Sequence, residues 1–152
     1  KEAWVKMKIN HITDTDMVQK LYQASKAGVK IDIVIRGNCS LVPGMPNLSE
    51  NIHCVGIIDR YLEHSRILIF ANGGKPRYFI GSADWMPRNL LNRIEVLTPV
   101  YDEEMQADLM RTVSYGMRDT INGRIVDGKG TNAFVEGEPF RSQEELYKAY
   151  QK

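Results

Sequence analysis

Residues 4–37 form the pattern that most restricts the fold of this chain. "WVKMKIN" (4–10) alternates apolar and polar residues, which is typical of a half-buried strand. Residues 13–28 supply capping oxygens, apolar side chains at helical spacing and a terminal glycine, so they predict a helix. "VKIDIVIRG" (29–37) is rich in β-branched residues and predicts a second strand. A strand, helix and strand at this spacing predict two parallel strands joined by a right-handed crossover.

The rest of the chain adds strands and helices around this βαβ unit. We expect strands at 52–58, 65–70, 77–83 and 94–100, a glycine turn in "ANGGKPR", an amphipathic helix at 102–119 and a terminal helix at 141–152 capped by Ser142. A Gly-rich segment between the two helices is irregular or forms a short hairpin. The fold class predicted for residues 1–152 is α/β, a single domain with a mixed β-sheet flanked by helices.

The segment "GNCSLVPGMPNLSEN" (37–51) predicts a long loop after the second strand, because Gly, Pro, Asn and Ser recur throughout it. Open α/β folds bind ligands at the carboxyl edge of their parallel strands, and long ordered loops are often functional. We therefore expect this edge to carry a site.

The composition excludes several classes of protein. A length of 152 residues suits one domain with its own core, and a net charge of +1 gives no overall attraction for nucleic acid or an anionic membrane. No apolar stretch approaches the ~20 residues that span a bilayer, and no signal-peptide pattern opens the chain. The first residue is not Met, which favours a fragment of a longer protein.

The number and spacing of the cysteines and histidines do not predict a metal site. Cys39 and Cys54 lack the spacing of a zinc site or a disulfide framework, which indicates reduced thiols in a cytosolic protein. His11, His53 and His64 are too scattered to predict a metal cluster, so no metal ligands are assigned.

"YLEHSRILIF" places a histidine and an arginine where a strand enters the core. Alternation along that strand would put His64 and Arg66 on one face, about 6–7 Å apart. An imidazole that titrates near neutral pH beside a fixed cation suits an oxygen that leaves phosphorus. Packing at a strand end is the more common explanation of a lone His-x-Arg pair. Asp59 and Glu63 either orient His64 or pair with Arg60, and the sequence does not choose between these.

Two further elements favour phosphate binding. Arg36 ends the second strand, where its planar guanidinium can hold two phosphate oxygens and Gly37 permits close approach. Gly81 and Ser82 end a later strand, where a hydroxyl and backbone N–H groups can bind an oxyanion. The alternatives are a surface ion pair for Arg36 and a strand-to-helix turn capped by Asp84.

These motifs resemble one half of a phospholipase D-like domain, whose signature is His-x-Lys, a later Asp and Gly-Ser-x-Asn. Arg66 stands here in place of the Lys, Ala71 lies near the position of the Asp, and Asp84 replaces the Asn. "ASKAGVKIDIVIRGNCSLVPGMPNLSENI", "RYLEHSR" and "GSADWMPRN" are together similar to the C-terminal domain of bacterial polyphosphate kinase. The resemblance covers residues 5–119 and weakens in 120–152.

The resemblance implies a transferase, an ATP:polyphosphate phosphotransferase. In that family a histidine in a preceding phospholipase D-like half takes the γ-phosphate of ATP as a phosphohistidine, and the phosphate passes reversibly to the end of polyphosphate. His64 matches the second active-site histidine and is the expected catalytic residue, which also contacts nucleotide. Arg36 matches an arginine that contacts nucleotide phosphates. The weaker expected phosphate contacts are Arg60, Arg66, Arg88 and Ser82.

The same resemblance implies ligands, partners and location. Mg²⁺ accompanies ATP, although no ligand pair for it stands in this sequence. The partners are ATP or ADP, polyphosphate, the preceding domains of the enzyme and further copies of it, in the cytoplasm and peripherally at the inner membrane. We expect the 152-residue chain alone to be inactive. Two alternatives stay open, a polyphosphate- or nucleotide-binding module and a dimeric phospholipase D-like phosphodiesterase.

Overall fold

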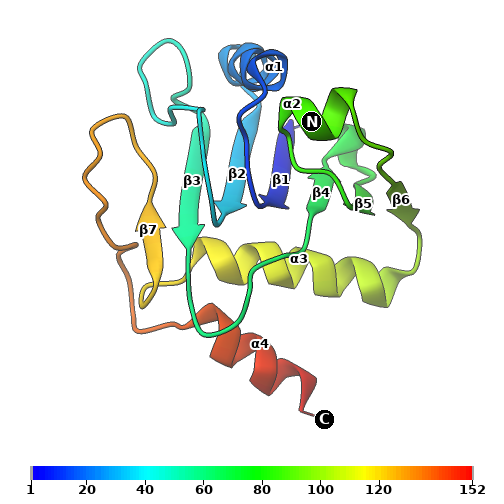
Figure 1. Cartoon of the computed structure of the whole chain (residues 1–152). Coiled ribbons are helices and arrows are strands. Elements are labelled where there is room, and N and C mark those ends of the chain that lie inside the picture. The colour runs from blue at the N-terminus through cyan, green and yellow to red at the C-terminus, as the bar shows by residue number, and fades with distance from the viewer. Residues whose placement is uncertain (1, 152) are drawn as a thin grey trace.

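The computed structural model describes residues 2–151, which form one β-sheet with helices on both faces (Figure 1). Its strands are β1 (Trp4–Ile9), β2 (Lys30–Ile35), β3 (Ile52–Ile57), β4 (Ile67–Phe70), β5 (Arg77–Gly81), β6 (Leu97–Val100) and β7 (Gly123–Ile125). Its helices are α1 (Thr15–Lys26), α2 (Pro87–Leu91), α3 (Glu103–Met117) and α4 (Ser142–Tyr150), with a 3-10 turn at Asn72–Gly74.

The sheet is mixed, with the strand order β6-β5-β4-β1-β2-β3-β7. β1 pairs in parallel with β2, and β2 with β3, whereas the other neighbours are antiparallel. The predicted βαβ unit and the α/β fold class are therefore confirmed. The carboxyl ends of β1, β2 and β3 share one edge of the sheet, the lower edge in Figure 1.

Alternation along the strands divides the core into two layers. One layer joins β1, β2 and α1, and the other packs the opposite face of the sheet against α3 through the fully buried Val113. α1 starts at Asp14 and α3 at Asp102, and each carboxylate accepts a backbone hydrogen bond from the first turn, as the predicted acidic starts require. Gly28 ends α1 with a φ of 85°, a conformation that favours glycine.

The predicted strand at 65–70 starts too early. β4 begins at Ile67, so His64 and Arg66 precede the strand and do not alternate along it. They belong to residues 58–66, hereafter the histidine loop, which has no helix or strand structure. The reason is that side chains hold this part of the chain, and pairing with β5 begins only at the Arg66 carbonyl, which accepts from the Gly81 N–H at 3.2 Å.

Two other predicted boundaries are wrong. β6 begins at Leu97 rather than at residue 94. Arg141, not Ser142, occupies the cap position of the terminal helix α4. Ser142 is the first helical residue, and its hydroxyl donates to Asp119 at 2.6 Å, so it serves to anchor the helix instead of capping it.

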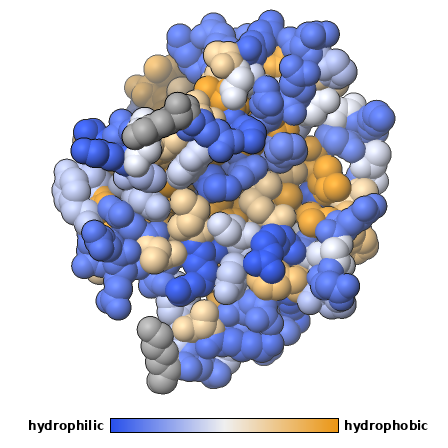
Figure 2. All heavy atoms as spheres, turned by 180° about the vertical axis from the view of Figure 1, so that it is seen from behind, coloured by the Kyte–Doolittle hydropathy of each residue, from blue (hydrophilic) through white to orange (hydrophobic). Residues whose placement is uncertain are grey.

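No helix within residues 2–151 is long and apolar enough to cross a lipid bilayer. Some large hydrophobic side chains nevertheless reach the surface, among them Leu91, Ile94 and Tyr101, which are 77%, 100% and 83% exposed. Figure 2 shows hydrophobic groups set among hydrophilic ones on the face seen from behind. Leu91 and Ile94 lie in or just after α2, and Tyr101 directly follows β6, so exposed hydrophobic side chains stand on both sides of this edge strand.

Candidate phosphate-binding site

Arg36 and His64 come together at the carboxyl edge of the sheet. Arg36 directly follows β2, and the histidine loop returns His64 to its side, so that Arg36 Nη2 lies 3.3 Å from His64 Nδ1. When Nδ1 accepts this hydrogen bond, the proton of the neutral imidazole sits on Nε2. A guanidinium charge and a titratable ring thus meet at the surface, and their role in phosphate binding stays a prediction.

Asn10, just after β1, orients Arg36. Its Oδ1 accepts a hydrogen bond of 2.6 Å from Arg36 Nε, and the residue is fully buried. Its Nδ2 has no hydrogen-bond partner within residues 2–151. The contact with Arg36 makes Asn10 a member of the site. Sequence reasoning missed it, although an Asn at the end of a strand on this edge was a usable signal.

Arg66 is committed to protein partners. Its Nη2 and Nε lie 3.1 and 3.3 Å from the two oxygens of Asp84, and its Nη1 donates to the His64 carbonyl at 3.0 Å. Burial raises the pKa of Asp84, but the hydrogen bonds from Arg66 and from the Asn10 backbone outweigh this and hold it below its usual range. Arg66 therefore holds His64 through its backbone. Asp84 accepts from backbone N–H groups of β1's end rather than capping α2.

The charges around His64 disfavour its protonated form. The nearby Arg66 guanidinium lowers the pKa of His64 most, followed by burial and by Arg36, while Asp84 acts in the opposite direction. The neutral ring is therefore favoured near neutral pH. An anion beside Arg36 would offset the arginine charges and raise the pKa of His64, which would favour a protonated ring that can donate to a phosphate oxygen.

Lys8 is a buried charge beside the site that motif reasoning missed. Its side chain is 4% exposed, and its Nζ lies 3.0 Å from Glu63 and donates to Ser65 Oγ at 2.8 Å. Burial lowers the pKa of Lys8, against the opposing effect of Glu63. Neither contact that the sequence left open for Glu63, with the His64 ring or with Arg60, is present among the described residues; Glu63 pairs with Lys8 instead. Only the alternation of "WVKMKIN" hinted at this residue, and it suggested a surface position.

The other predicted phosphate contacts are more dispersed. Arg60 lines an exposed hollow together with Arg36. The Ser82 hydroxyl donates to Glu95, in the segment before β6. Arg88 is exposed on α2 and has no ion pair within residues 2–151. The structure therefore places Arg60 on the same hollow as Arg36 and gives Ser82 and Arg88 no contact with the Arg36–His64 pair in the described part of the chain.

Gly37 is required by a side chain of the protein itself. A Cβ at this position would lie 2.3 Å from His11 Cε1 and 2.9 Å from the Asn10 carbonyl oxygen. The next residue, Asn38, donates its backbone N–H to His11 Nδ1 at 3.0 Å. The close approach that Gly37 permits is thus used to pack His11 against the end of β2.

Residues 2–151 contain no group of three or more His, Cys, Asp or Glu side chains placed to hold a metal. The carboxylates nearest His64 are engaged, Glu63 with Lys8 and Asp84 with Arg66. The binding of Mg²⁺ together with ATP stays a prediction.

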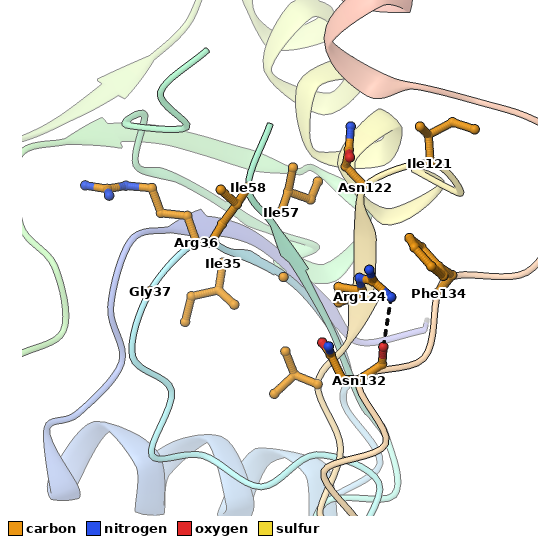
Figure 3. Close-up of a pocket in the computed structure, with 12 residues that line it drawn as sticks. Ile35, Arg36, Gly37, Ile57, Ile58, Ile121, Asn122, Arg124, Asn132 and Phe134 are labelled. Carbon is orange, nitrogen blue, oxygen red and sulfur yellow. Dashed lines mark hydrogen bonds between the residues drawn. The ribbon is translucent and has the colours of Figure 1, made fainter. Parts of the chain in front are cut away.

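An open cavity of about 440 Å³ adjoins the site between the end of β3 and the segment around β7. Apolar side chains such as Ile57 and Ile121 line it, and the Arg124 guanidinium lies 3.3 Å from the centroid of the Phe134 ring. Figure 3 shows Arg36 at its rim, with the guanidinium directed away from Phe134. The cavity is therefore a neighbour of the Arg36–His64 pair and does not receive the Arg36 charge.

The fold defines a structural class. The chain superposes on a phospholipase D family member, Nuc from Salmonella typhimurium, with a TM-score of 0.63 over 84% of each chain and 15% identity. NucT from Helicobacter pylori gives a TM-score of 0.51 at 20% identity, over 74% of this chain and 76% of that one. At these identities the likeness concerns the fold alone, and it confirms the predicted phospholipase D-like architecture.

The family is narrower than this class. The family model described as "Polyphosphate kinase C-terminal domain 2" matches residues 1–144, and the chain belongs to that family. Polyphosphate kinase from Vibrio vulnificus (strain YJ016) is 46% identical over 150 residues, which is 97% of this chain. Polyphosphate kinase from Escherichia coli (strain K12) is 40% identical over 131 residues, which is 86% of this chain. The resemblance seen in "RYLEHSR" and "GSADWMPRN" is confirmed.

A solved structure supports the same family assignment. The crystal structure of polyphosphate kinase from Porphyromonas gingivalis superposes with a TM-score of 0.92 and 41% identity, over 98% of this chain and 23% of that one. The matched regions cover 21% of the Vibrio protein and 19% of the Escherichia protein, so the chain spans about a fifth of the length of the curated relatives it matches.

Proposed function

We propose that this chain is the part of a polyphosphate kinase that supplies Arg36 and His64 to reversible phosphoryl transfer between ATP and the end of polyphosphate. The observation that carries this proposal is the contact between Arg36 Nη2 and His64 Nδ1, at 3.3 Å, on the ligand-binding edge of an α/β sheet. Membership of the family supports the choice of substrate.

The geometry suits the electrostatic part of such a reaction. Arg36 Nε is held by Asn10 and Nη2 by His64, and within residues 2–151 no protein group takes a hydrogen bond from Nη1. Nη1 would therefore bind a phosphate oxygen without moving the side chain. Phosphoryl transfer depends mainly on positioning and on neutralising charge, which a held guanidinium provides.

The covalent steps need a second histidine on a preceding domain. There the nucleophilic ring nitrogen would form a P–N bond to the γ-phosphorus while the P–O bond to ADP breaks. An oxygen at the end of polyphosphate would then displace that nitrogen, forming a P–O bond as the P–N bond breaks. Protonated His64 would donate its Nδ1 proton to the departing oxygen in the first step. Its hydrogen bond from Arg36 Nη2, which needs a free Nδ1 lone pair, would open in that state and re-form when the neutral ring is restored.

An alternative is that the chain binds polyphosphate or nucleotide without turnover by itself, since it holds only half of this constellation. A phospholipase D-like phosphodiesterase is less well supported, because Arg66 and Asp84 replace the Lys and Asn of that signature and pair with each other. For the longer enzyme we also propose a cytoplasmic location, peripheral association with the membrane and assembly into a homo-oligomer.

Calorimetric titration of the 152-residue chain with tripolyphosphate and with Mg-ATP tests the site. We expect Arg36→Ala and His64→Ala to weaken binding about tenfold or more, because charge-assisted hydrogen bonds contribute about 1.5–3 kcal/mol each. Lys148→Ala is the matched control, since this exposed lysine on α4 pairs only locally with Glu145. Unchanged binding in both site variants would remove the assignment. Synthesis of polyphosphate by the chain alone, at the rate of a full-length relative, would contradict the two-histidine scheme.

A further inference from the structure

The histidine loop lacks the usual means of holding a backbone in place. It has no helix or strand structure, and its side chains Tyr61 and Leu62 are 60% and 71% exposed. His64, whose position decides the geometry of the site, is exposed as well. Apolar burial therefore does not fix this segment, and polar contacts must do so.

The start of α4 supplies the first of these contacts. Arg141 Nη2 and Nε lie 2.6 and 3.0 Å from the two oxygens of Asp59, at the beginning of the histidine loop. The Asp59 side chain is only 3% exposed. The Arg141 hydrogen bonds hold the pKa of Asp59 below its usual range, against the effect of burial. This pair joins residues 82 positions apart in the sequence, at the place where Figure 1 shows the loop passing the start of α4.

Gln143 holds the middle of the loop. Its amide oxygen accepts the Tyr61 N–H at 2.8 Å, and its amide nitrogen donates to the Tyr61 carbonyl at 2.8 Å. The same nitrogen donates to Glu63 Oε1 at 2.6 Å. One side chain thus satisfies both backbone groups of Tyr61, as a neighbouring strand would, and also reaches the residue before His64.

Lys8 completes the series from the sheet side. It pairs with the second oxygen of Glu63 and donates to Ser65, on either side of His64. The contacts from Arg141, Gln143 and Lys8 therefore reach every second residue of the loop, namely Asp59, Tyr61 (through its backbone), Glu63 and Ser65. The intervening residues, Arg60, Leu62 and His64, are exposed. The Leu62 carbonyl accepts the His64 N–H at 3.0 Å, so the chain turns just before His64, whose exposed ring then meets Arg36.

The start of α4 is itself fixed to the sheet. The Ser142 N–H and hydroxyl both donate to Asp119 Oδ2, at 2.8 and 2.6 Å, and Asp119 is fully buried. The other carboxylate oxygen accepts N–H groups of the turn that leads to β7. Asp119 follows α3, which packs on the sheet. Arg141 and Gln143, which lie at this anchored start of α4, therefore tie the histidine loop to a part of the chain that is itself fixed.

We propose that Arg141 and Gln143 are positioning residues for the phosphoryl-transfer site: by holding Asp59, Tyr61 and Glu63 they set His64 against Arg36. This inference rests on the proposed function, because it concerns the same site. It assigns a role to the C-terminal helix, which lies far from the active-site motifs in the sequence.

The position of His64 can be measured apart from ligand binding. Arg66, Arg36 and Lys8 face its ring and favour the neutral form, and Asp84 favours the charged form. When the loop is released, His64 moves away from the arginines and titrates nearer its ordinary value. NMR titration of the His64 ring in the 152-residue chain reads out this change, and calorimetry with tripolyphosphate reads out binding.

We expect Gln143→Ala and Arg141→Ala to raise the pKa of His64 and to weaken tripolyphosphate binding about fivefold to tenfold, a loss of about 1–1.4 kcal/mol. Lys148→Ala, on the same helix, should change neither quantity. Arg141→Lys keeps one charge contact with Asp59 and should fall between wild type and Arg141→Ala. Amide signals of β1 and β2 that match wild type show that the sheet stays folded.

The outcomes separate the two hypotheses. If the pKa of His64 is the same in Gln143→Ala, Arg141→Ala and wild type, the positioning role is wrong, whatever the affinity. If the variants raise this pKa but wild type does not bind tripolyphosphate, the positioning role stands and the proposed function fails.

Discussion

Two loops leave neighbouring parallel strands at the same edge of this sheet, and only the first of them buries a large apolar side chain. Residues 37–51, after β2, fold back onto α1, where Leu41 is 2% exposed and the Val42 N–H donates to the Tyr22 hydroxyl at 2.9 Å. The histidine loop, after β3, exposes its hydrophobic side chains and is held by ion pairs and amide contacts.

The comparison shows that the loop whose composition predicts ligand binding is not the loop that carries the candidate catalytic residue. The Gly- and Pro-rich loop 37–51 has the composition that predicts a ligand-binding loop, yet it is anchored away from the Arg36–His64 pair, by the buried Leu41, by Tyr22 of α1 and by its own buried Ser49. The histidine loop has an ordinary composition and carries His64. Backbone held by directional polar contacts can keep one side chain exposed and in register, whereas apolar burial draws side chains inward.

The largest expected effect comes from breaking the buried pair under the histidine loop. Glu63→Ala leaves Lys8, which is 4% exposed, without its counter-charge. Removing one partner of a buried ion pair costs about 3–5 kcal/mol, so we expect a loss near the lower end, because Glu63 is 15% exposed. Urea denaturation measures it, with Lys148→Ala as the exposed control. A loss below about 1 kcal/mol would show that solvent relieves Lys8.

Leu41→Ala probes the other loop. Truncating this buried leucine should lower the free energy of unfolding by about 2–4 kcal/mol through lost burial and a cavity. The affinity for tripolyphosphate should stay at the wild-type value under native conditions, because Leu41 makes no contact with the Arg36–His64 pair in the described residues. Parallel denaturation and calorimetry decide this. A tenfold loss of affinity would mean that the two loops are coupled.

Arg66 links the histidine loop to Asp84 by charge and geometry. Arg66→Met should cost about 1–3 kcal/mol, because it leaves a buried carboxylate without its charged partner. It should also raise the pKa of His64, since the Arg66 charge is the largest cause of its depression. Arg66→Lys keeps the charge and should leave that pKa closer to wild type. NMR titration of His64 in both variants is the measurement, and an equal rise in both would rule out the charge as the cause.

The smallest expected effect is a pH dependence of binding. The pKa of His64 is depressed in the free protein, and an anion raises it, so binding takes up a proton. The affinity for tripolyphosphate should therefore rise as pH falls through this range, by at most about tenfold per pH unit for one proton. His64→Gln removes the titration, and the difference between the two pH profiles cancels the ionisation of tripolyphosphate itself. Superimposable profiles would exclude a role for His64 protonation.

Sequence reasoning succeeded where the determining contacts are local or follow from periodicity. The alternation in "WVKMKIN" and the spacing in α1 gave β1, α1 and β2, and parallel strand ends necessarily share an edge, which placed Arg36 there. The hairpin turn before β5 followed from its glycines, since Gly73 and Gly74 take φ values of 64° and 93°.

The parts of the site that sequence reasoning missed depend on contacts between side chains that are far apart in the sequence, and no residue spacing predicts such contacts. Gln143 meets Tyr61 and Arg141 meets Asp59 across 82 residues, and many other polar residues were equally available for these contacts. Burial of Lys8 likewise requires the histidine loop to fold over it. The strand expected at His64 failed for the same reason, because side-chain contacts from α4 take the place of a neighbouring strand.

The proposed site requires that Arg36 and His64 bind the same phosphate. NMR of the 152-residue chain with ¹⁵N-labelled arginine and histidine follows the Arg36 Nε signal and the His64 ring during titration with tripolyphosphate, with Arg111 on α3 as the reference. We predict that the two signals shift together, saturate with one dissociation constant, and leave Arg111 unmoved. Binding detected by calorimetry while Arg36 and His64 stay at their starting positions would contradict the claim.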